Sequence, residues 1–426
     1  MTTTSDYLRI TIERPAYGPY GVGHQEDGKV VLVQRGIPGD VVLAKPLISK
    51  PRMVEASIVE VLEPSPDRRQ PPCPAHSTCG GCPWMHMTRE AQLRHKQTVL
   101  NQALRKLLSP QCPACPPLRY DTNEISYRQR ARLHVAADGI SPLRIGFFSL
   151  GTHDIVPISG CPICLPALDA VIASLAAWVP REQFNGSMEF IVDDLDRVMA
   201  IFYLAQRYPE PQRLADELGR ATQLDGCQVV SPKTERASWG LKEASITVQE
   251  KPPCTIPIFP GAFSQANRSM NQELVSHVVE IFGQFGGASD ILELYAGHGN
   301  FTYPLAGAGF RVQAVETGLR TDLLPEVPGV RFTRQDATTF LGHVVSKGQS
   351  VDKILLDPPR WGAKTAVPFI IKLAPQRIVY VSCDPSTFAR DAGNLQEAGY
   401  TMSQVTAFDL MPQTFHTELV AVFVAK

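Results

Sequence analysis

The C-terminal part of the chain shows the pattern that constrains the fold most strongly, a regular alternation of strand-like and helix-like segments. From Phe259 onward, seven short apolar segments are separated by helical or Gly/Pro-rich stretches. The expected strands are 291–294, 312–315, 330–333, 353–356, 377–382, 402–407 and 417–424. Such alternation is typical of a doubly wound, mostly parallel sheet that binds ligands at the carboxyl ends of its strands. We therefore predict an α/β protein with its site at that edge of the sheet.

The residues before Phe259 are organised differently. Short apolar segments separated by Gly/Pro turns predict a small β-barrel over 1–62. A Pro-rich linker follows, and the stretch up to 258 mixes expected strands and helices. We expect three domains, 1–62, 63–258 and 259–426, of which the middle one is of α+β type. A helix over 88–108, with Thr88 as its N-cap, is a candidate to pack on the third domain.

Composition excludes several classes of protein. Among 426 residues, 41 Lys and Arg nearly balance 42 Asp and Glu, so the chain is not a uniformly basic nucleic-acid binder. A local basic segment does exist, because Arg89 to Arg144 holds ten Lys and Arg against four Asp and Glu. No apolar run reaches the about 18 residues of a membrane helix, and the N-terminal segment lacks a signal-peptide pattern. We expect a cytoplasmic protein that does not enter membranes.

A glycine turn follows the first expected strand of the third domain. The sequence Ile291-Leu-Glu-Leu-Tyr-Ala-Gly-His-Gly-Asn-Phe-Thr would let the backbone of Gly297 and Gly299 approach a ligand closely. Many such turns carry glycine for steric reasons alone. Here, however, Glu316 ends the next strand, about the spacing at which a carboxylate binds a ribose. The missing third glycine favours S-adenosylmethionine over NAD.

Three further residues at expected strand ends carry reactive groups. Asp357 begins the sequence Asp-Pro-Pro-Arg, in which it either faces a ligand or only caps the strand. Cys383 follows a strand and is a candidate nucleophile, although a lone Cys is usually a small buried apolar residue. Glu418 lies inside an apolar strand, where it is either a solubilising edge residue or a base with a raised pKa.

These motifs resemble the RNA 5-methyluridine methyltransferase family, in the order in which that family carries them. The matching segments are Phe263-Ser-Gln-Ala-Asn, Leu292-Glu-Leu-Tyr-Ala-Gly-His-Gly-Asn-Phe, Ala314-Val-Glu, Asp357-Pro-Pro-Arg, Val381-Ser-Cys-Asp-Pro and Pro412-Gln-Thr-Phe-His-Thr-Glu. The N-terminal stretch, with Gly36-Ile-Pro-Gly-Asp, resembles the small OB-like RNA-binding barrel of that family, the TRAM domain. The resemblance spans nearly the whole chain and implies a seven-stranded Rossmann-like methyltransferase domain over 259–426.

The resemblance also implies an activity and roles for particular residues. Cys383 would add to carbon-6 of a uracil, and Glu418 would remove the carbon-5 proton after methyl transfer. The cofactor pocket for S-adenosylmethionine would be formed by Gln265, Tyr295, Asn300, Glu316, Asp336 and Asp357. The substrate would be a flipped or single-stranded uridine in RNA, with 23S ribosomal RNA favoured and the protein acting as a monomer. The alternatives are a tRNA uridine methyltransferase, a cytosine methyltransferase or an RNA-binding protein without catalysis.

The ten cysteines allow two kinds of metal site. By resemblance, the ligands of a 4Fe–4S cluster would be Cys73, Cys79, Cys82 and Cys161. By spacing, the pairs 79/82 and 112/115 suit a zinc ion with four thiolate ligands. Either choice leaves Cys164 without a role, and the cluster also leaves Cys112 and Cys115 without one.

One segment departs from the family. The thirteen residues from Thr317 to Gly329, with two prolines, are too few for the full helix that the family places there. We expect that helix to be shortened or lost.

Overall fold

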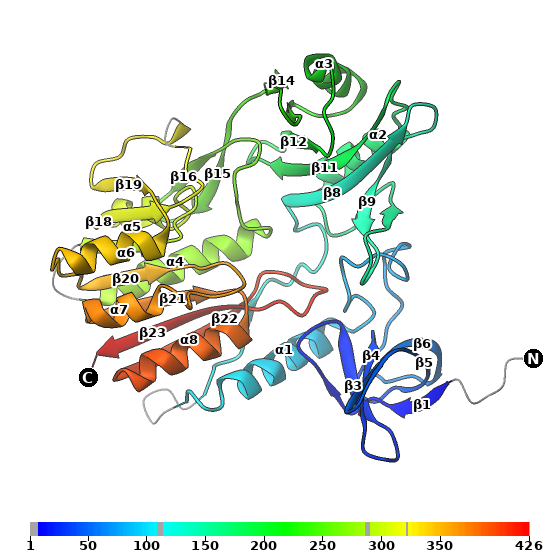
Figure 1. Ribbon diagram of the computed structural model, residues 1–426, viewed down its shortest axis with the longest axis horizontal. Helices are drawn as coiled ribbons and strands as arrows, with labels where there is room; N and C mark the ends of the chain where they lie inside the picture. The colour runs from blue at the N-terminus through cyan, green and yellow to red at the C-terminus, as the bar shows by residue number, and fades with distance from the viewer. Residues whose placement is uncertain (1–6, 109–113, 235, 286–289, 321–322, 426) are drawn as a thin grey trace, which may run out of the picture. The chain divides into compact units, whose positions relative to one another are not determined.

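The computed structural model describes residues 7–108, 114–234, 236–285, 290–320 and 323–425, and its ribbon is shown in Figure 1. The chain divides into two compact units. Unit 1 comprises Met1–Gln102 and Met411–His416, and unit 2 comprises Ala103–Leu410 and Thr417–Lys426. In the described ranges, every helix is too short or too polar to span a membrane.

Unit 1 is built on a six-stranded sheet in the order β1-β5-β6-β4-β3-β2. Its strands are β1 (Leu8–Thr11), β2 (Arg14–Pro15), β3 (Tyr20–His24), β4 (Val30–Gln34), β5 (Val41–Lys50) and β6 (Met53–Glu63). Alternate residues of these strands point inward and form one apolar core, made of Ile10, Ile12, Val31, Val33, Val42, Ala44, Val54 and Ala56. The strands expected over 1–62 are present, and two of them, β5 and β6, are ten and eleven residues long.

A buried carboxylate fixes the segment that follows this sheet. Asp40 is fully buried and accepts hydrogen bonds from the backbone N–H groups of Ile37 and Ser65, each at 2.9 Å. Arg68 forms an ion pair with it. Helix α1 (Arg89–Leu104) begins further on, and Thr88 Oγ1 accepts a hydrogen bond from the N–H of Ala91, so its predicted N-cap role is confirmed.

The short segment Met411–His416 belongs to unit 1 although it lies near the C-terminus. The N–H of Gln413 donates to Gln92 Oε1 at 2.8 Å, and its carbonyl accepts from the N–H of Trp84 at 2.9 Å. Lys96 donates to the carbonyl of Met411 at 2.9 Å. The segment Met411–His416 contains most of the motif that begins at Pro412, and α1 and the loop before it hold this segment in place.

The middle of the chain forms a seven-stranded sheet in unit 2, in the order β10-β9-β8-β11-β12-β13-β14. Its strands are β8 (Arg130–Asp138), β9 (Arg144–Phe148), β10 (Ile155–Pro157), β11 (Gln183–Val192), β12 (Val198–Leu204), β13 (Gly226–Val230) and β14 (Ala237–Gly240). Helices α2 (Pro166–Ala177) and α3 (Pro211–Ala221) pack on it. A two-stranded hairpin of β15 (Ala244–Gln249) and β16 (Cys254–Ile258) follows.

The last part of unit 2 is the α/β sheet that carries the predicted site. The strands are β17 (Asp290–Leu294), β18 (Arg311–Glu316), β19 (Val330–Arg334), β20 (Lys353–Leu356), β21 (Arg377–Ser382), β22 (Tyr400–Asp409) and β23 (Glu418–Ala425). The helices are α4 (Arg268–Gln284), α5 (Thr302–Gly307), α6 (Ala337–Ser346), α7 (Val367–Leu373) and α8 (Pro385–Glu397). The order is β19-β18-β17-β20-β21-β23-β22, and only β23 runs antiparallel to its neighbours. The predicted doubly wound sheet is confirmed.

This sheet differs from the expected seven strands in one respect and agrees with the expected loss of a helix in another. The sheet has an eighth strand rather than seven, because β7 (Arg119–Tyr120) pairs in parallel with the end of β22. Two residues from so distant a part of the chain carry no periodicity that a sequence pattern can reveal. Between β18 and β19, the described residues 317–320 and 323–329 form no α-helix, in agreement with the short segment there.

Candidate active site

The turn after β17 has a backbone that only particular residues allow. Tyr295, Gly297 and Gly299 all have positive φ angles, of 62°, 55° and 97°. A Cβ atom on Gly299 would lie 2.3 Å from the ring of Tyr303, so a side chain does not fit there. The positive φ angles therefore allow the tight backbone turn at the carboxyl end of β17 that the sequence predicted, and the N–H of Gly299 closes it by donating to the carbonyl of Ala296 at 3.1 Å.

Two predicted carboxylates flank this turn. Glu316, at the end of β18, accepts hydrogen bonds from the N–H of Gly297 at 3.2 Å and of Gly318 at 2.9 Å. Asp336 caps α6 by accepting from the N–H of Thr339 at 2.9 Å. Burial, followed by the charges of Asp336, Asp391 and Glu316, raises the pKa of Tyr295 to about 12. The structure thus brings Tyr295, Glu316 and Asp336 together.

The two remaining amide residues of the predicted pocket lie beside α4. Asn300 and Asn271, the latter on α4, exchange two side-chain hydrogen bonds of 2.8 and 3.0 Å. Gln265 is buried in the loop before α4, where its carbonyl accepts from Gln129 Nε2 at 2.9 Å. Both residues are held in fixed positions on the side of the sheet where α4 begins.

Sheet register places the candidate nucleophile beside the candidate base. Ser382, the last residue of β21, pairs with Leu419 of β23. The next residues outward along these antiparallel strands are Cys383 and Glu418, which therefore face each other at the sheet edge. Cys383 is half-buried and Glu418 is buried. Asp357 follows β20, the strand on the other side of β21.

These groups influence one another's protonation. Burial, and then the charges of Glu418 and Asp357, raise the pKa of the Cys383 thiol to about 12, and Arg360 opposes the rise. Burial and the charge of Asp357 hold the pKa of Glu418 well above its ordinary value, again against Arg360. Burial raises the pKa of Asp357 to about 7. Three acidic groups packed this closely favour their protonated forms in the free protein.

Two residues of this site were not predicted. Arg360 acts on both Cys383 and Glu418 and opposes the rise of their pKa values, and its signal was its place in the Asp-Pro-Pro-Arg motif. Asp391 on α8 is fully buried and accepts hydrogen bonds from Tyr380 Oη at 2.8 Å and from the N–H of Ala363 at 2.7 Å. Arg390, the residue before it, also pairs with Asp391 at 2.8 Å. The two buried partners, Tyr380 and Ala363, are distant in the chain, so nothing in the sequence marks Asp391.

The residue after Cys383 has a structural role. The Asp384 carboxylate accepts hydrogen bonds from the N–H groups of Ser386 and Thr387, each at 2.9 Å, and so caps α8. Asn, which is common at this position in the family that the sequence resembles, is an equally good N-cap residue. The Asp found here is therefore compatible with the same local fold.

The predicted metal ligands lie in both units. Cys73, Cys79 and Cys82 are half-buried in unit 1, and Cys79 Sγ accepts a hydrogen bond from the N–H of Gly81 at 3.4 Å. Cys161 is buried in unit 2, where a hydrogen bond from Cys164 lowers the pKa of its thiol to about 7. Across the described ranges, no three Cys, His, Asp or Glu side chains are arranged to hold a metal ion. Cys112 lies outside the described residues.

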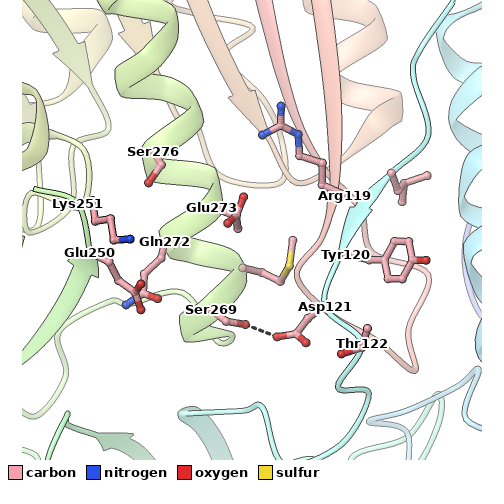
Figure 2. Close-up of a pocket in the computed structure, with 12 residues that line it drawn as sticks. Arg119, Tyr120, Asp121, Thr122, Glu250, Lys251, Ser269, Gln272, Glu273 and Ser276 are labelled. Atoms are coloured by element: carbon pink, nitrogen blue, oxygen red, sulfur yellow. Dashed lines mark hydrogen bonds between the residues drawn. The ribbon is translucent and has the colours of Figure 1, made fainter. Parts of the chain in front are cut away.

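A cavity of about 920 Å³ lies elsewhere in unit 2 (Figure 2). Its lining consists of Leu118, Arg119, Tyr120, Asp121, Thr122, Glu250, Lys251, Ser269, Met270, Gln272, Glu273 and Ser276. Figure 2 shows Asp121 and Ser269 facing each other in a hydrogen bond across one end of it. None of the predicted site residues lines this cavity, and its mixed charges indicate no particular ligand.

The basic segment from Arg89 to Arg144 contains two arginines of β8 whose charges are partly neutralised by one glutamate. Arg130 and Arg132 lie on one face of β8 and both pair with Glu189 of β11, at 2.9 and 3.5 Å. The Arg130 guanidinium also lies 5.1 Å from the centre of the exposed Phe263 ring. Tyr127, which precedes these arginines in the sequence, is buried.

Comparison with known proteins connects this site to one activity. The family described as tRNA (Uracil-5-)-methyltransferase matches residues 242–321 and 333–426. A protein of Halomonas elongata named 23S rRNA (uracil(1939)-C(5))-methyltransferase RlmD is 30% identical, over 96% of this chain and 88% of that protein. A Vibrio campbellii protein of the same name is 27% identical over 97% of this chain and 95% of its own length.

The fold agrees with a solved structure. The tRNA (uracil-54, C5)-methyltransferase of Pyrococcus abyssi, in complex with S-adenosyl-L-homocysteine, superposes with a TM-score of 0.72 at 23% identity, over 98% of this chain and 100% of that one. At this identity the likeness establishes the α/β methyltransferase fold. With the match to the Halomonas relative, 30% identical over 88% of that protein, it leads to one conclusion: this chain belongs to the RNA (uracil-C5)-methyltransferase family.

Proposed function

We propose that this enzyme methylates carbon-5 of a uridine in 23S ribosomal RNA with S-adenosylmethionine as the donor. The observation that carries the proposal is that Cys383 and Glu418 directly follow the last β21–β23 pair, Ser382 and Leu419, at the edge of a methyltransferase sheet, close enough for Glu418 to raise the pKa of the thiol. The choice of ribosomal RNA over tRNA is supported by the names of the relatives that this chain matches over 95% and 88% of their lengths. The preference for uracil over cytosine is supported by the sequence His416-Thr-Glu, which matches a motif of the uracil family.

The roles of the two residues follow from the chemistry of uracil. Bound S-adenosylmethionine supplies an electrophilic methyl group on a sulfonium, but carbon-5 of uracil is too weak a nucleophile to take it unaided. The Cys383 thiolate forms a bond to carbon-6, and the electrons of the 5,6 double bond move to the carbon-4 carbonyl. Once carbon-5 carries the methyl group, Glu418 accepts its proton, the double bond re-forms and the bond from sulfur to carbon-6 breaks. Arg360 favours the ionised forms that both steps require.

The residues present suit the cofactor. The turn that begins at Tyr295 lies beside Glu316, which accepts a hydrogen bond from the N–H of Gly297, and a carboxylate at the end of the second strand is where a ribose hydroxyl binds in such sheets. We assign the cofactor pocket to Gln265, Tyr295, Asn300, Glu316, Asp336 and Asp357.

Replacing Cys383 by Ala tests the mechanism. The variant is expected to transfer no methyl group to uridine-containing RNA while it still binds S-adenosylhomocysteine, measured by calorimetry. Buried Cys227→Ala is the matched control, because that thiol lies away from the site and forms a hydrogen bond to the carbonyl of Ala215. Methyl transfer by Cys383→Ala would exclude the proposed nucleophile. Mapping 5-methyluridine in total RNA from cells with and without the gene identifies the substrate.

We further propose that Cys73, Cys79, Cys82 and Cys161 hold a 4Fe–4S cluster, with zinc as the alternative. Four thiol ligands suit either metal, and the N–H bond to Cys79 Sγ is of the kind that stabilises cluster thiolates. Anaerobic purification followed by iron, sulfide and zinc analysis separates the two. About four iron atoms per chain are expected, and a stoichiometric zinc content without sulfide would overturn the cluster.

The N-terminal barrel completes the proposal. We propose that residues 1–62 are an RNA-binding TRAM domain, that 63–258 and 259–426 are the second and third domains, and that the enzyme acts as a cytoplasmic monomer. Exposed Lys50 and Arg52 at the tip of the β5–β6 hairpin are candidates for phosphate contacts. Replacing both by Ala is expected to lower RNA affinity and its salt dependence. An unchanged salt dependence would contradict this role, and sedimentation measures the oligomeric state.

A further inference from the structure

Trp361 lies on the surface beside the active site. It belongs to the loop between β20 and α7, four residues after Asp357, and its side chain is 73% exposed. Tryptophan is usually well buried, and an exposed one close to a functional site typically marks a binding surface. None of the functions proposed above uses this indole group.

The backbone of the loop is held firmly, although the indole is exposed. Arg390 donates a hydrogen bond to the carbonyl of Trp361 at 2.9 Å, and Thr387 donates to the preceding carbonyl at 3.0 Å. The next residue, Gly362, has φ 77°, and a Cβ there would lie 2.5 Å from side-chain atoms of Arg390 and Asp391. All three side chains come from α8, which begins two residues after Cys383. The indole is therefore presented from a rigid support that is shared with the catalytic strand.

The surroundings of Trp361 are cationic. Its chain neighbours Arg360 and Lys364 are exposed, and Arg390 is partly exposed. Arg360 is close enough to affect the protonation of both Cys383 and Glu418, so the loop borders the reaction centre. An exposed aromatic ring among cations is the composition with which proteins bind single-stranded nucleic acid, the ring stacking on a base and the cations contacting phosphates.

We propose that Trp361 stacks on an unpaired nucleobase next to the target uridine. The inference rests on the proposed function, since it requires an RNA substrate. The target base itself must reach the half-buried Cys383, whereas the indole is at the surface, so a neighbouring base is the one it contacts. Trp361 thereby contributes to the affinity for RNA and to the choice of sequence around the uridine.

The expected effect is on binding. Removal of one base-stacking side chain weakens nucleic-acid binding by ~1–3 kcal/mol, which corresponds to about 5- to 150-fold in Kd. Trp361→Ala is expected to show such a loss in RNA affinity and in KM for RNA, with kcat retained at saturating RNA. Trp361→Phe, which keeps an aromatic ring, is expected to recover much of the affinity.

The experiment uses the full-length protein and an RNA oligonucleotide with an unpaired uridine, with Kd measured by fluorescence anisotropy in the presence of S-adenosylhomocysteine. Ile140→Ala is the matched control, because Ile140 is also a strongly exposed apolar residue but lies in the β8–β9 turn. A second RNA lacks the base beside the uridine. If the inference holds, this RNA binds wild type and Trp361→Ala almost equally.

The outcomes separate the two proposals. Equal affinity of wild type and Trp361→Ala for the intact RNA would overturn the stacking contact. The contact would also be overturned if Trp361→Ala lost the same factor in affinity, relative to wild type, for the RNA that lacks the neighbouring base. If the wild type binds RNA but methylates none, the proposed function is wrong, and the affinity measurements still decide whether Trp361 contacts a base. Unchanged binding of S-adenosylhomocysteine by Trp361→Ala shows that the variant is folded.

Discussion

Glu293 makes the stability of unit 2 depend on pH. Its side chain is buried on β17, where Thr302 Oγ1 donates a hydrogen bond to Oε2 at 2.6 Å and Oε1 has no hydrogen-bond partner. Burial raises the pKa of this carboxyl group from 4.5 to about 8, and the charge of Asp357 adds to the rise. The folded protein thus keeps Glu293 protonated at pH values at which the unfolded chain has released the proton.

The sign and size of the effect follow from this difference. The stability that the protonated carboxyl contributes is fully present below pH 4.5 and is lost as the pH rises toward 8. Each pH unit in this interval costs ~1.4 kcal/mol, so the loss from pH 5.5 to pH 8.5 is roughly 3 kcal/mol. Glu293→Gln removes this pH dependence, because the amide does not titrate. It adds a cost of ~1–3 kcal/mol that is the same at every pH, since its amide nitrogen takes a position without an acceptor.

Thermal unfolding of wild type and Glu293→Gln at pH 5.5 and 8.5 measures the effect. Relative to wild type, Tm of the variant is expected to rise by ~6 °C between the two pH values, at about 2 °C per kcal/mol for a unit of this size. Exposed Glu397→Gln on α8 is the matched control and is expected to show no such change. A Tm difference between Glu293→Gln and wild type that is the same at both pH values would refute the reasoning.

Three further predictions concern the site and the RNA surface. Alkylation of Cys383 by iodoacetamide, followed by peptide mass spectrometry, should be slow at pH 7 and rise toward pH 12, and Arg360→Met should slow it further; a midpoint at or below pH 9 would contradict the raised pKa of the thiol. Asp391→Ala should lower the stability of unit 2 by ~1–3 kcal/mol for each of the two buried donors, Tyr380 Oη and the N–H of Ala363, and should also break the ion pair with the partly exposed Arg390; a Tm equal to wild type would disprove the anchoring role. Arg132→Ala should reduce the salt dependence of RNA binding by about one phosphate contact, whereas an unchanged slope would show that Arg132 only pairs with Glu189.

Much of the fold was predictable because local sequence patterns, apolar segments and glycine turns, indicate its strands and turns. The strands of the α/β sheet are short apolar segments, and their positions agree with the structure to within one or two residues at most ends. The turn at Gly297 and Gly299 was also predictable, since its positive φ angles favour glycine. The strand order then places Cys383 and Glu418 together, as the motifs indicated.

The remaining features depend on contacts between distant residues and leave no local pattern. Strand β7 has two residues and exists only because β22 offers a free edge. Asp391 is indistinguishable in sequence from a surface carboxylate, yet it is buried and holds the loop of Trp361. Tyr127 lies in the basic segment and its ring is buried, which residue type alone does not reveal.

The most direct test of the central claim is the covalent bond between Cys383 and RNA. Glu418→Gln, incubated with S-adenosylmethionine and a uridine-containing substrate RNA, should form the bond and transfer the methyl group but fail to eliminate, because the carbon-5 proton has no acceptor. A slow band on a denaturing gel is expected, with the RNA attached to the Cys383 peptide in mass spectrometry and absent from the double variant with Cys383→Ala. Normal turnover by Glu418→Gln without an adduct would contradict the account.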